Sequence, residues 1–364
     1  MWLHDVDGLL TANDLSKTVD YIASLQLPSG MVQWFEGGHA DPWNHTEALM
    51  ALATGGRVED ARRGFEWLRI IQRPDGSWHQ YYLADSVEQD KLDANVIAYV
   101  AAGVWHHWLL TEDRQWLESM WDMVDRAIEF VIDLQTPRGE IIWARHADGT
   151  PWTFALLTGS SSMLHSIRSA IAIAEVLGQP RPDWELAAAR LSNAIRNVPE
   201  AFAPKHRWAM DWYYPVLCGA ITGDTARQRI DDRYEAFVMD GCGVRCVSDR
   251  PWITAAETCE FVMSLLSIGD RERAEQLFSW AQRHRDDEGR YWTGIVYPDE
   301  ATFPGGEQSS YTAAAVVLGA DALAAKSPVS HLFTDHDAFP PLIDVTIDDT
   351  SDEVSDEVAD RSGD

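Results

Sequence analysis

The sequence predicts an all-α fold, a double ring of six helical hairpins known as the (α/α)6 barrel. Three observations support this prediction. A turn motif that ends in Gly and Trp recurs along the chain and divides it into hairpins. Amphipathic segments alternate with segments rich in Ala, Gly and Ser. Almost no segment shows the strict apolar–polar alternation that is typical of a β-strand.

The recurring motif is clearest in RGFEWLRIIQRPDGSW, residues 63–78. Apolar residues fall at helical spacing up to Gln72, the turn Pro74-Asp75-Gly76 ends the helix, and Trp78 follows. The same pattern occurs in three further segments: LQLPSGMVQW (25–34), LQTPRGEIIW (134–143) and AQRHRDDEGRYW (281–292).

Six outer helices are expected, each with one charged face. We expect Asn13 to cap the first, and Pro182 to occupy the first helical position of the fourth, where proline is tolerated. The expected ranges are 13–26, 63–72, 112–135, a helix from 182, 224–238 and 270–284.

Six inner helices are expected to follow them, because small side chains allow close packing on both sides of a helix. The first is expected to begin near Asn44 and to end at Gly55-Gly56, and Ser160–Ser162 to cap the third. The second inner helix is expected to end at residue 108 and the third at residue 177. The fourth is expected within residues 205–223, the fifth over 253–269 and the sixth over 311–325.

The chain has 364 residues, and the repeats favour one toroidal domain over residues 1–330. Residues 331–364 form a C-terminal extension that is acidic and is expected to be disordered from about residue 344.

Charge and cysteine usage limit the partners. The net charge of −29 repels nucleic acid and anionic membranes, so neither is expected as a partner. The four cysteines show no metal-type spacing, so no metal and no cofactor are expected. No secretory signal and no membrane-spanning run is visible, which favours the cytoplasm, and the oligomeric state stays open.

The turn motif closely resembles the QW-type repeat of terpene cyclases and protein prenyltransferases, and the order of hairpins over residues 13–326 resembles that of six-hairpin glycosidases. The chain also resembles an actinobacterial group often labelled prenyltransferase-like, and within that group it resembles the α-endomannosidases that process methylmannose polysaccharide. This resemblance implies an intracellular glycoside hydrolase that cleaves an α-(1→4)-mannan with two carboxylates, in the inverting mode. The identity of the sugar rests wholly on the resemblance.

In a double ring, the loops after the outer helices and the first turns of the inner helices line one mouth. Here these segments are rich in acids, which hydrogen-bond sugar hydroxyls, and in flat aromatic rings, which stack on sugar faces. The predicted partner is therefore an oligosaccharide or polysaccharide. The predicted substrate-binding residues are Trp43, His45, Glu47, Asp93, Trp143, Trp152, Asp211, Tyr213, Tyr214, Arg245, Asp249, Trp252, Trp292 and Tyr311.

Glycoside hydrolysis needs one protonated carboxyl and one carboxylate. We predict Asp41, beside polar Asn44 before the first inner helix, as the base. Glu257 lies in the first turn of another inner helix among apolar neighbours, which should raise its pKa, so it is the predicted acid. Each of them has a purely structural alternative, because an acid at a helix start also stabilises the helix dipole.

Glu307 is the main rival of these two carboxyls as a catalytic residue. Its surroundings, PGGEQSSYTAAA, resemble the stretch near the catalytic base of glucoamylase-like enzymes. The acid motif of those enzymes is absent, because Ala144 follows Trp143 where an acid would stand.

Two other classes of function stay open. A terpenoid cyclase would need a DxDD motif in the funnel, but DDTSDE lies in the tail. A prenyltransferase would need a zinc site, and Asp240, Cys242 and His284 match no ligand pattern. A non-catalytic carbohydrate-binding toroid would have the same acidic and aromatic mouth as a glycoside hydrolase, but it would bind the sugar without cleaving it.

Overall fold

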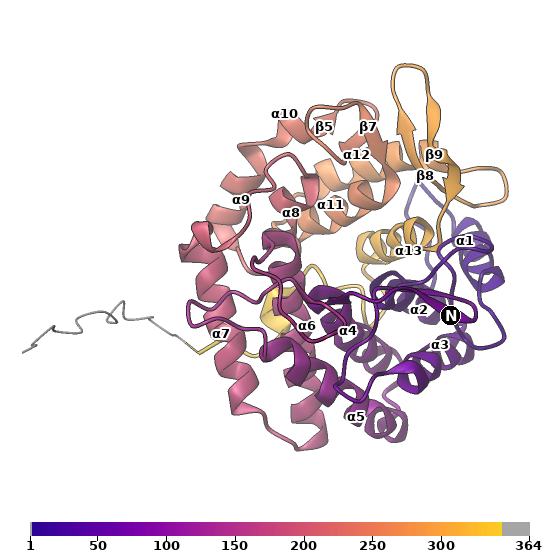
Figure 1. Cartoon of the computed structure of the whole chain (residues 1–364). Helices are drawn as coiled ribbons and strands as arrows, with labels where there is room; N and C mark the ends of the chain where they lie inside the picture. Colours follow the sequence, from indigo (N-terminus) through magenta and orange to yellow (C-terminus); the bar gives the residue numbers. More distant parts are fainter. Residues whose placement is uncertain (1, 344–364) are drawn as a thin grey trace, which may run out of the picture.

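A computed structural model describes residues 2–343, and the tail expected from about residue 344 lies outside this range. Figure 1 shows two concentric rings of helices. The inner ring consists of α2 (Pro42–Thr54), α4 (Ala94–Thr111), α6 (Leu157–Leu177), α8 (Ala209–Leu217), α11 (Ala255–Ser267) and α13 (Ser310–Ala324). The outer ring consists of α1 (Ala12–Ser24), α3 (Val58–Ile71), α5 (Arg114–Ile132), α7 (Pro182–Asn197), α9 (Gly223–Asp231) with α10 (Tyr234–Phe237), and α12 (Arg271–Ala281).

The inner ring is closed, because each inner helix packs against the next and α13 packs against α2. Small residues make this approach possible: at Gly103 of α4, a side chain would overlap Thr46 of α2. Since every inner helix follows an outer helix, all six inner helices run in the same direction. Their first turns therefore meet at one end of the ring. The predicted fold class is confirmed.

The recurring glutamine ties each of the first three outer helices to the next one. The side-chain amide of Gln72 donates to the carbonyl of Gly76 at 2.9 Å, which closes its own turn, and to that of Met123 in α5 at 2.9 Å. Gln26 and Gln135 make the same two bonds to their own turns and to carbonyls of α3 and α7. Gly76 has φ +85°, and any side chain there would overlap the carbonyl of Arg126. The motif is therefore a joint between neighbouring hairpins.

The last hairpin joins the first with different groups. The hydroxyl of Thr18 in α1 donates to the carbonyl of Gly289 at 2.8 Å, and Arg285 forms an ion pair with Asp14 at 2.8 Å. The Oε1 of Gln282 accepts from the hydroxyl of Tyr291, so this glutamine stays within its own turn. The outer ring thus closes on α1.

The expectation of almost no strands is wrong. The described residues contain nine short strands, all in the loops between outer and inner helices: β1 (Tyr81–Leu83), β2 (Ser86–Gln89), β3 (Leu92–Asp93), β4 (Ala144–Arg145), β5 (Val238–Met239), β6 (Gly243–Arg245), β7 (Trp252–Thr254), β8 (Trp292–Val296) and β9 (Ala301–Gln308). They form two two-stranded sheets, β1-β2 and β3-β4, and one antiparallel sheet of order β5-β6-β7-β8-β9. In the register of the larger sheet, Ile253 pairs with Ile295 and Trp292 with Gln308. Most strands are too short for an alternating pattern to emerge.

Three local expectations are also wrong. Thr11, not Asn13, caps α1, since its side chain accepts from the backbone of Asp14. Ser160–Ser162 lie inside α6 and are buried, so they are no cap. The fifth outer helix breaks into α9 and α10 around Asp232 and Arg233.

The described part of the C-terminal extension packs against the inner ring. Phe333 stacks on His165 of α6 with ring centroids 4.8 Å apart, and Phe339 is buried beside the same imidazole. Arg168 donates to the carbonyl of His336 at 3.0 Å. This segment covers the end of the ring that is remote from the first turns of the inner helices.

The joint between hairpins can be tested with Gln72→Ala. This variant loses two hydrogen bonds to buried carbonyls, and we expect it to lower the free energy of unfolding by about 1–3 kcal/mol. Urea denaturation measures the change. Gln115→Ala, an exposed glutamine on α5, is the matched control and should stay within about 0.5 kcal/mol of the parent protein. Equal stabilities of the two variants would contradict the proposed joint.

Candidate active site

Asp41 is the N-cap of α2 and is held in place from three sides. Its Oδ1 accepts the backbone N–H groups of Trp43 at 3.0 Å and Asn44 at 2.9 Å, and its Oδ2 accepts the side-chain amide of Asn44. Pro42 at the first helical position fixes the backbone. Burial raises the pKa of Asp41 to about 6, although the bonds from Asn44 and Trp43 favour the charged form.

Glu257 lies in the first turn of α11, directly after β7, and α13 separates α11 from α2 in the inner ring. Its side chain is partly exposed, unlike its neighbours Ala256 and Thr258. Burial in the mouth raises the pKa of Glu257 above its ordinary value. A carboxyl that reaches solvent and has a raised pKa is suited to donate a proton to a ligand.

A buried cluster of side chains lies beneath Asp41 and Glu257. One of its members, Glu260, was not predicted from the sequence. Glu260, one turn after Glu257 on α11, is 1% exposed. It accepts hydrogen bonds from the hydroxyls of Tyr213, Tyr214 (3.0 Å) and Tyr311 (2.7 Å). Glu47 of α2 is 2% exposed and lines the same small cavity. We call the two carboxyls and three tyrosines the central cluster.

Asp41 and Glu257 both face this cluster. The carboxyls of Asp41 and Glu47 interact, as do those of Glu257 and Glu260, so that within each pair a charge on one carboxyl raises the pKa of the other. Burial is the first cause in both cases, and Glu260 also raises the pKa of Glu47. Helix spacing agrees, since residues three apart lie on one face of α11. Asp41 and Glu257 therefore both lie at the mouth, on α2 and α11, which α13 separates in the inner ring.

Aromatic rings line the mouth around the carboxyls. Trp43 lies between Tyr99 and Tyr311, with ring centroids 5.2 and 5.3 Å away. Trp143 and Trp152 form a second aromatic group in the loop before α6, with centroids 4.7 Å apart. These two groups frame the mouth from the α2 and α6 sides.

Comparison with known proteins decides the family. An MMP endo-(1,4)-3-O-methyl-alpha-D-mannosidase from Mycolicibacterium hassiacum is 50% identical over 332 residues, which cover 91% of this chain and 92% of that protein. The chain belongs to this mannosidase family. It is thus a glycoside hydrolase, as predicted, and not a terpenoid cyclase. No family model matches.

Solved structures agree on the fold. A glycosidase aligns with a TM-score of 0.66 at 13% identity over 86% of this chain and 99% of its own. A D-mannose isomerase aligns with 0.68 at 10% identity over 86% of this chain and 96% of its own. A sugar epimerase from a ruminal bacterium aligns with 0.64 at 10% identity over 85% of this chain and 98% of its own. At such identities the likeness concerns the ring alone.

Two further acidic residues of this mannosidase, Asp93 and Asp211, lie at the edge of the mouth. Asp93 caps α4, accepts from the backbone of Asn95 at 3.1 Å, and lies 3.4 Å from the ammonium of Lys91, which also covers Trp143. Asp211 accepts from the hydroxyl of Thr158 at 3.0 Å. Burial raises the pKa of both carboxyls. Asp211 also lines a hollow beside α9.

His45, Arg245 and Asp249 face protein or bulk solvent rather than the mouth. The Nδ1 of His45 accepts from the backbone of Val32 at 3.0 Å, and its Nε2 lies 3.1 Å from the carbonyl of Gly64, so both ring nitrogens are used. Burial lowers the pKa of His45 to about 4, and the ring is neutral. Arg245 donates to the carbonyl of Val238, and Asp249 forms an exposed ion pair with Arg207. These contacts favour structural roles over the predicted sugar binding.

The remaining aromatic candidates belong to the five-stranded sheet at the rim. Trp252 in β7 is 37% exposed and lies 5.9 Å from the ring of Phe303. Trp292 in β8 is half-buried and pairs with Gln308 of β9. Figure 1 shows β8 and β9 projecting from the ring beside α1 and α13.

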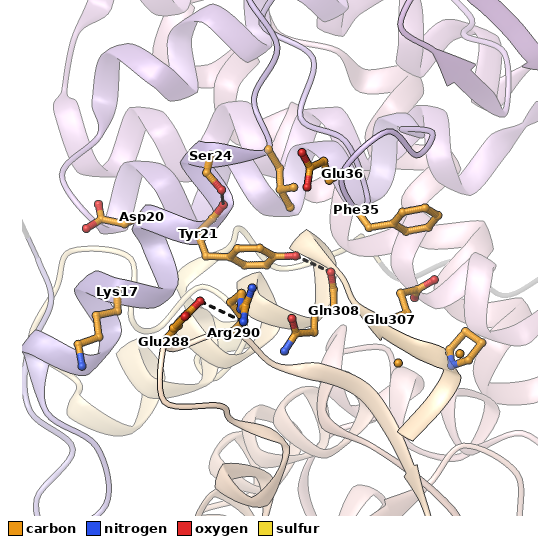
Figure 2. A pocket seen from close by; sticks show the side chains of 14 residues that line it. Lys17, Asp20, Tyr21, Ser24, Phe35, Glu36, Glu288, Arg290, Glu307 and Gln308 are labelled. Atoms are coloured by element: carbon orange, nitrogen blue, oxygen red, sulfur yellow. Dashed lines mark hydrogen bonds and ion pairs between the residues drawn. The ribbon is translucent and has the colours of Figure 1, made fainter. Parts of the chain in front are cut away.

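Glu307 lies on the flank of the ring. It accepts from the hydroxyl of Thr293 at 2.9 Å and lines a groove of about 900 Å³ between α1, the loop after Trp34, and β9. Figure 2 shows this flank groove, with Phe35 and Glu307 on one side and Tyr21 bonded to the carbonyl of Gln308 across it. Glu307 therefore lines the flank groove and is not a member of the central cluster.

Within residues 2–343, no His, Cys, Asp and Glu side chains form a group that is suited to a metal ion, and no helix is long and apolar enough to cross a membrane. The four cysteines form no disulfide, and Cys218 lies at the central cavity.

Proposed function

We propose that this chain cleaves internal α-(1→4) linkages of a 3-O-methylated mannan, the substrate class named for its M. hassiacum relative. The observation that supports this best is the 50% identity over nearly the whole chain. The mouth is consistent with it, since it holds carboxyls on α2 and α11 together with the aromatic rings of Trp43, Tyr99 and Tyr311.

In the proposed reaction Glu257 is the acid. Its O–H donates to the glycosidic oxygen while the bond from that oxygen to the anomeric carbon breaks. Partial exposure allows contact with the sugar, and burial of the rest of the side chain raises the pKa of Glu257 and so favours its protonated form. Asp41 is the base, because three hydrogen bonds orient its carboxylate and favour the charged form.

Asp41 takes one proton from a water molecule as the oxygen of that water adds to the anomeric carbon from the opposite side. The configuration is inverted, which needs a separation of roughly 6.5–9.5 Å between the two carboxyls to hold the water. The indole faces of Trp43 and Trp143 offer apolar surface to the O-methyl groups and C–H faces of the sugars.

An endo-acting enzyme must also accommodate the chain outside the cleavage site. The flank groove offers such a path, since Phe35 presents a 36% exposed ring beside Glu307. Its two cations are engaged: Arg290 pairs with Asp286 and Glu288, and Lys17 lies near Asp14. A groove with paired cations and an exposed aromatic ring suits a neutral polyhydroxyl chain better than an anionic ligand.

The substrate class is tested by incubating the protein with methylated α-(1→4)-mannan, unmethylated α-mannan and α-glucan. We expect new reducing ends and shorter oligosaccharides from the methylated mannan. Asp41→Asn and Glu257→Gln should each lower kcat by about 10²–10⁴-fold while binding persists, because each removes one proton-transfer group. Asp249→Asn, an exposed carboxylate, is the matched control. Prenyl-diphosphate turnover, or binding without cleavage of any glycan, would overturn the proposal.

The pH profile of kcat/KM tests the base. Asp41 acts only when deprotonated, and its pKa is about 6, so activity should fall as the pH drops below about 6. Glu257 acts only when protonated, and its raised pKa places the loss of activity on the alkaline side. Activity that stays unchanged down to about pH 4, where an ordinary Asp titrates, would contradict the role of Asp41.

The flank groove predicts a dependence on chain length. Phe35→Ala should raise KM for long methylated chains by roughly five- to tenfold, since contact with an aromatic face contributes about 1–1.5 kcal/mol. The KM for the shortest cleavable oligosaccharide should not change. Ile70→Ala, which removes an exposed apolar side chain from α3, is the control. An equal effect on long and short chains would show that the groove holds no part of the substrate.

A further inference from the structure

Glu47 and Glu260 lie at the centre of the ring, below the proposed catalytic pair, and no cation accompanies them. Among residues 2–343, neither forms an ion pair with lysine, arginine or histidine. They share a cavity with the imidazole of His165, and Phe333 of the C-terminal segment closes it from below. Burial lowers the pKa of His165 well below its usual range, so this ring is neutral. Two carboxylates in such a cavity cannot both be charged.

The hydrogen bonds indicate which of the two is charged. Glu260 accepts from three tyrosine hydroxyls, and each of these donors favours the ionised form. Glu47 has an oxygen, Oε2, that is buried and receives no hydrogen bond from the described residues. A buried oxygen without a donor is costly on a carboxylate and much less so on a neutral carboxylic acid. Geometry therefore places the proton on Glu47 and the negative charge on Glu260.

The groups that face Glu260 from the neighbouring helices do not neutralise this charge. Besides the three tyrosines, they are Tyr99 of α4, Cys218 after α8, and Cys259 and Glu257 of α11. Burial raises the pKa of Tyr99, Cys218 and Cys259, so all three are neutral. The remaining carboxyl in this group is Glu257, which lies one helical turn above Glu260 on the same face of α11 and is partly exposed at the mouth.

We propose that Glu47 and Glu260 hold one proton and one negative charge between them, and that this charge keeps Glu257 protonated and ready to act as the acid. The inference rests on the proposed function, because it assigns Glu260 a positioning role toward Glu257. Glu260 touches no substrate, since the tyrosines cover it. A buried negative charge makes it less favourable for Glu257 to ionise, and it does so without a hydrogen bond between them.

Two isosteric variants separate the members of the pair. Glu260→Gln removes the charge, and we expect the alkaline limb of the kcat/KM profile to move down by about one pH unit or more. Glu47→Gln resembles the protonated side chain, so the same limb should stay where it is. Glu118→Gln, an exposed glutamate on α5, is the control for an uncharged substitution. A limb that moves in Glu47→Gln, or in neither variant, would overturn the inference.

Infrared spectroscopy gives a second readout that does not depend on turnover. The C=O stretching band of a buried protonated carboxyl should be present at neutral pH in Glu257→Gln, which removes the contribution of the acid itself. The band should vanish when Glu47→Gln is added to that variant. A band that persists there would place the proton elsewhere and overturn the inference, even if Glu260→Gln fails to fold. Full activity of Glu257→Gln would instead refute the proposed catalytic role and leave the infrared result interpretable.

Discussion

A glutamine side chain that donates to two carbonyls holds each of the first hairpins to the next. The amides of Gln26, Gln72 and Gln135 each bond to their own turn and to the following outer helix. Such a bond is strong because its acceptors are main-chain groups that are largely removed from water. In the last hairpin Gln282 does not reach the next outer helix, and Thr18 and Arg285 join this hairpin to the first one instead. The positions of the inner helices, and so of every carboxyl at the mouth, follow from this closed ring.

The centre of the ring is polar, which distinguishes it from a core that merely fills space. Burying Glu47 and Glu260 costs free energy that the tyrosine hydroxyls offset only in part. A fold selected for stability alone would place apolar side chains there, as it does elsewhere along α11 and α13. That these two carboxyls are buried despite the cost in free energy is consistent with a site where protons are held and released.

The fold could be predicted from the sequence because its joints repeat, and the same Gln-turn-Gly-Trp pattern marks four of the six hairpins. The short strands could not, since segments such as Leu92–Asp93 are set by their partners rather than by their own pattern. Asp41 and Glu257 could be proposed from the sequence because they stand at helix starts beside the loops of the mouth. Glu260 was missed because it lies in TCEFVMS, which looks like an ordinary buried helix face. His45 shows the opposite limit, since spacing alone does not reveal that its ring faces α3.

The central claim is that a methylated mannan is cut between Asp41 and Glu257 above the central cluster. A crystal structure of Asp41→Asn with a methylated α-(1→4)-mannan oligosaccharide tests it most directly. The account predicts a sugar chain across the mouth, with one glycosidic oxygen at the carboxyl of Glu257 and a water molecule at residue 41 on the opposite face of the ring. An oligosaccharide seated with no glycosidic oxygen near Glu257, in the flank groove or beside Asp211, would contradict it.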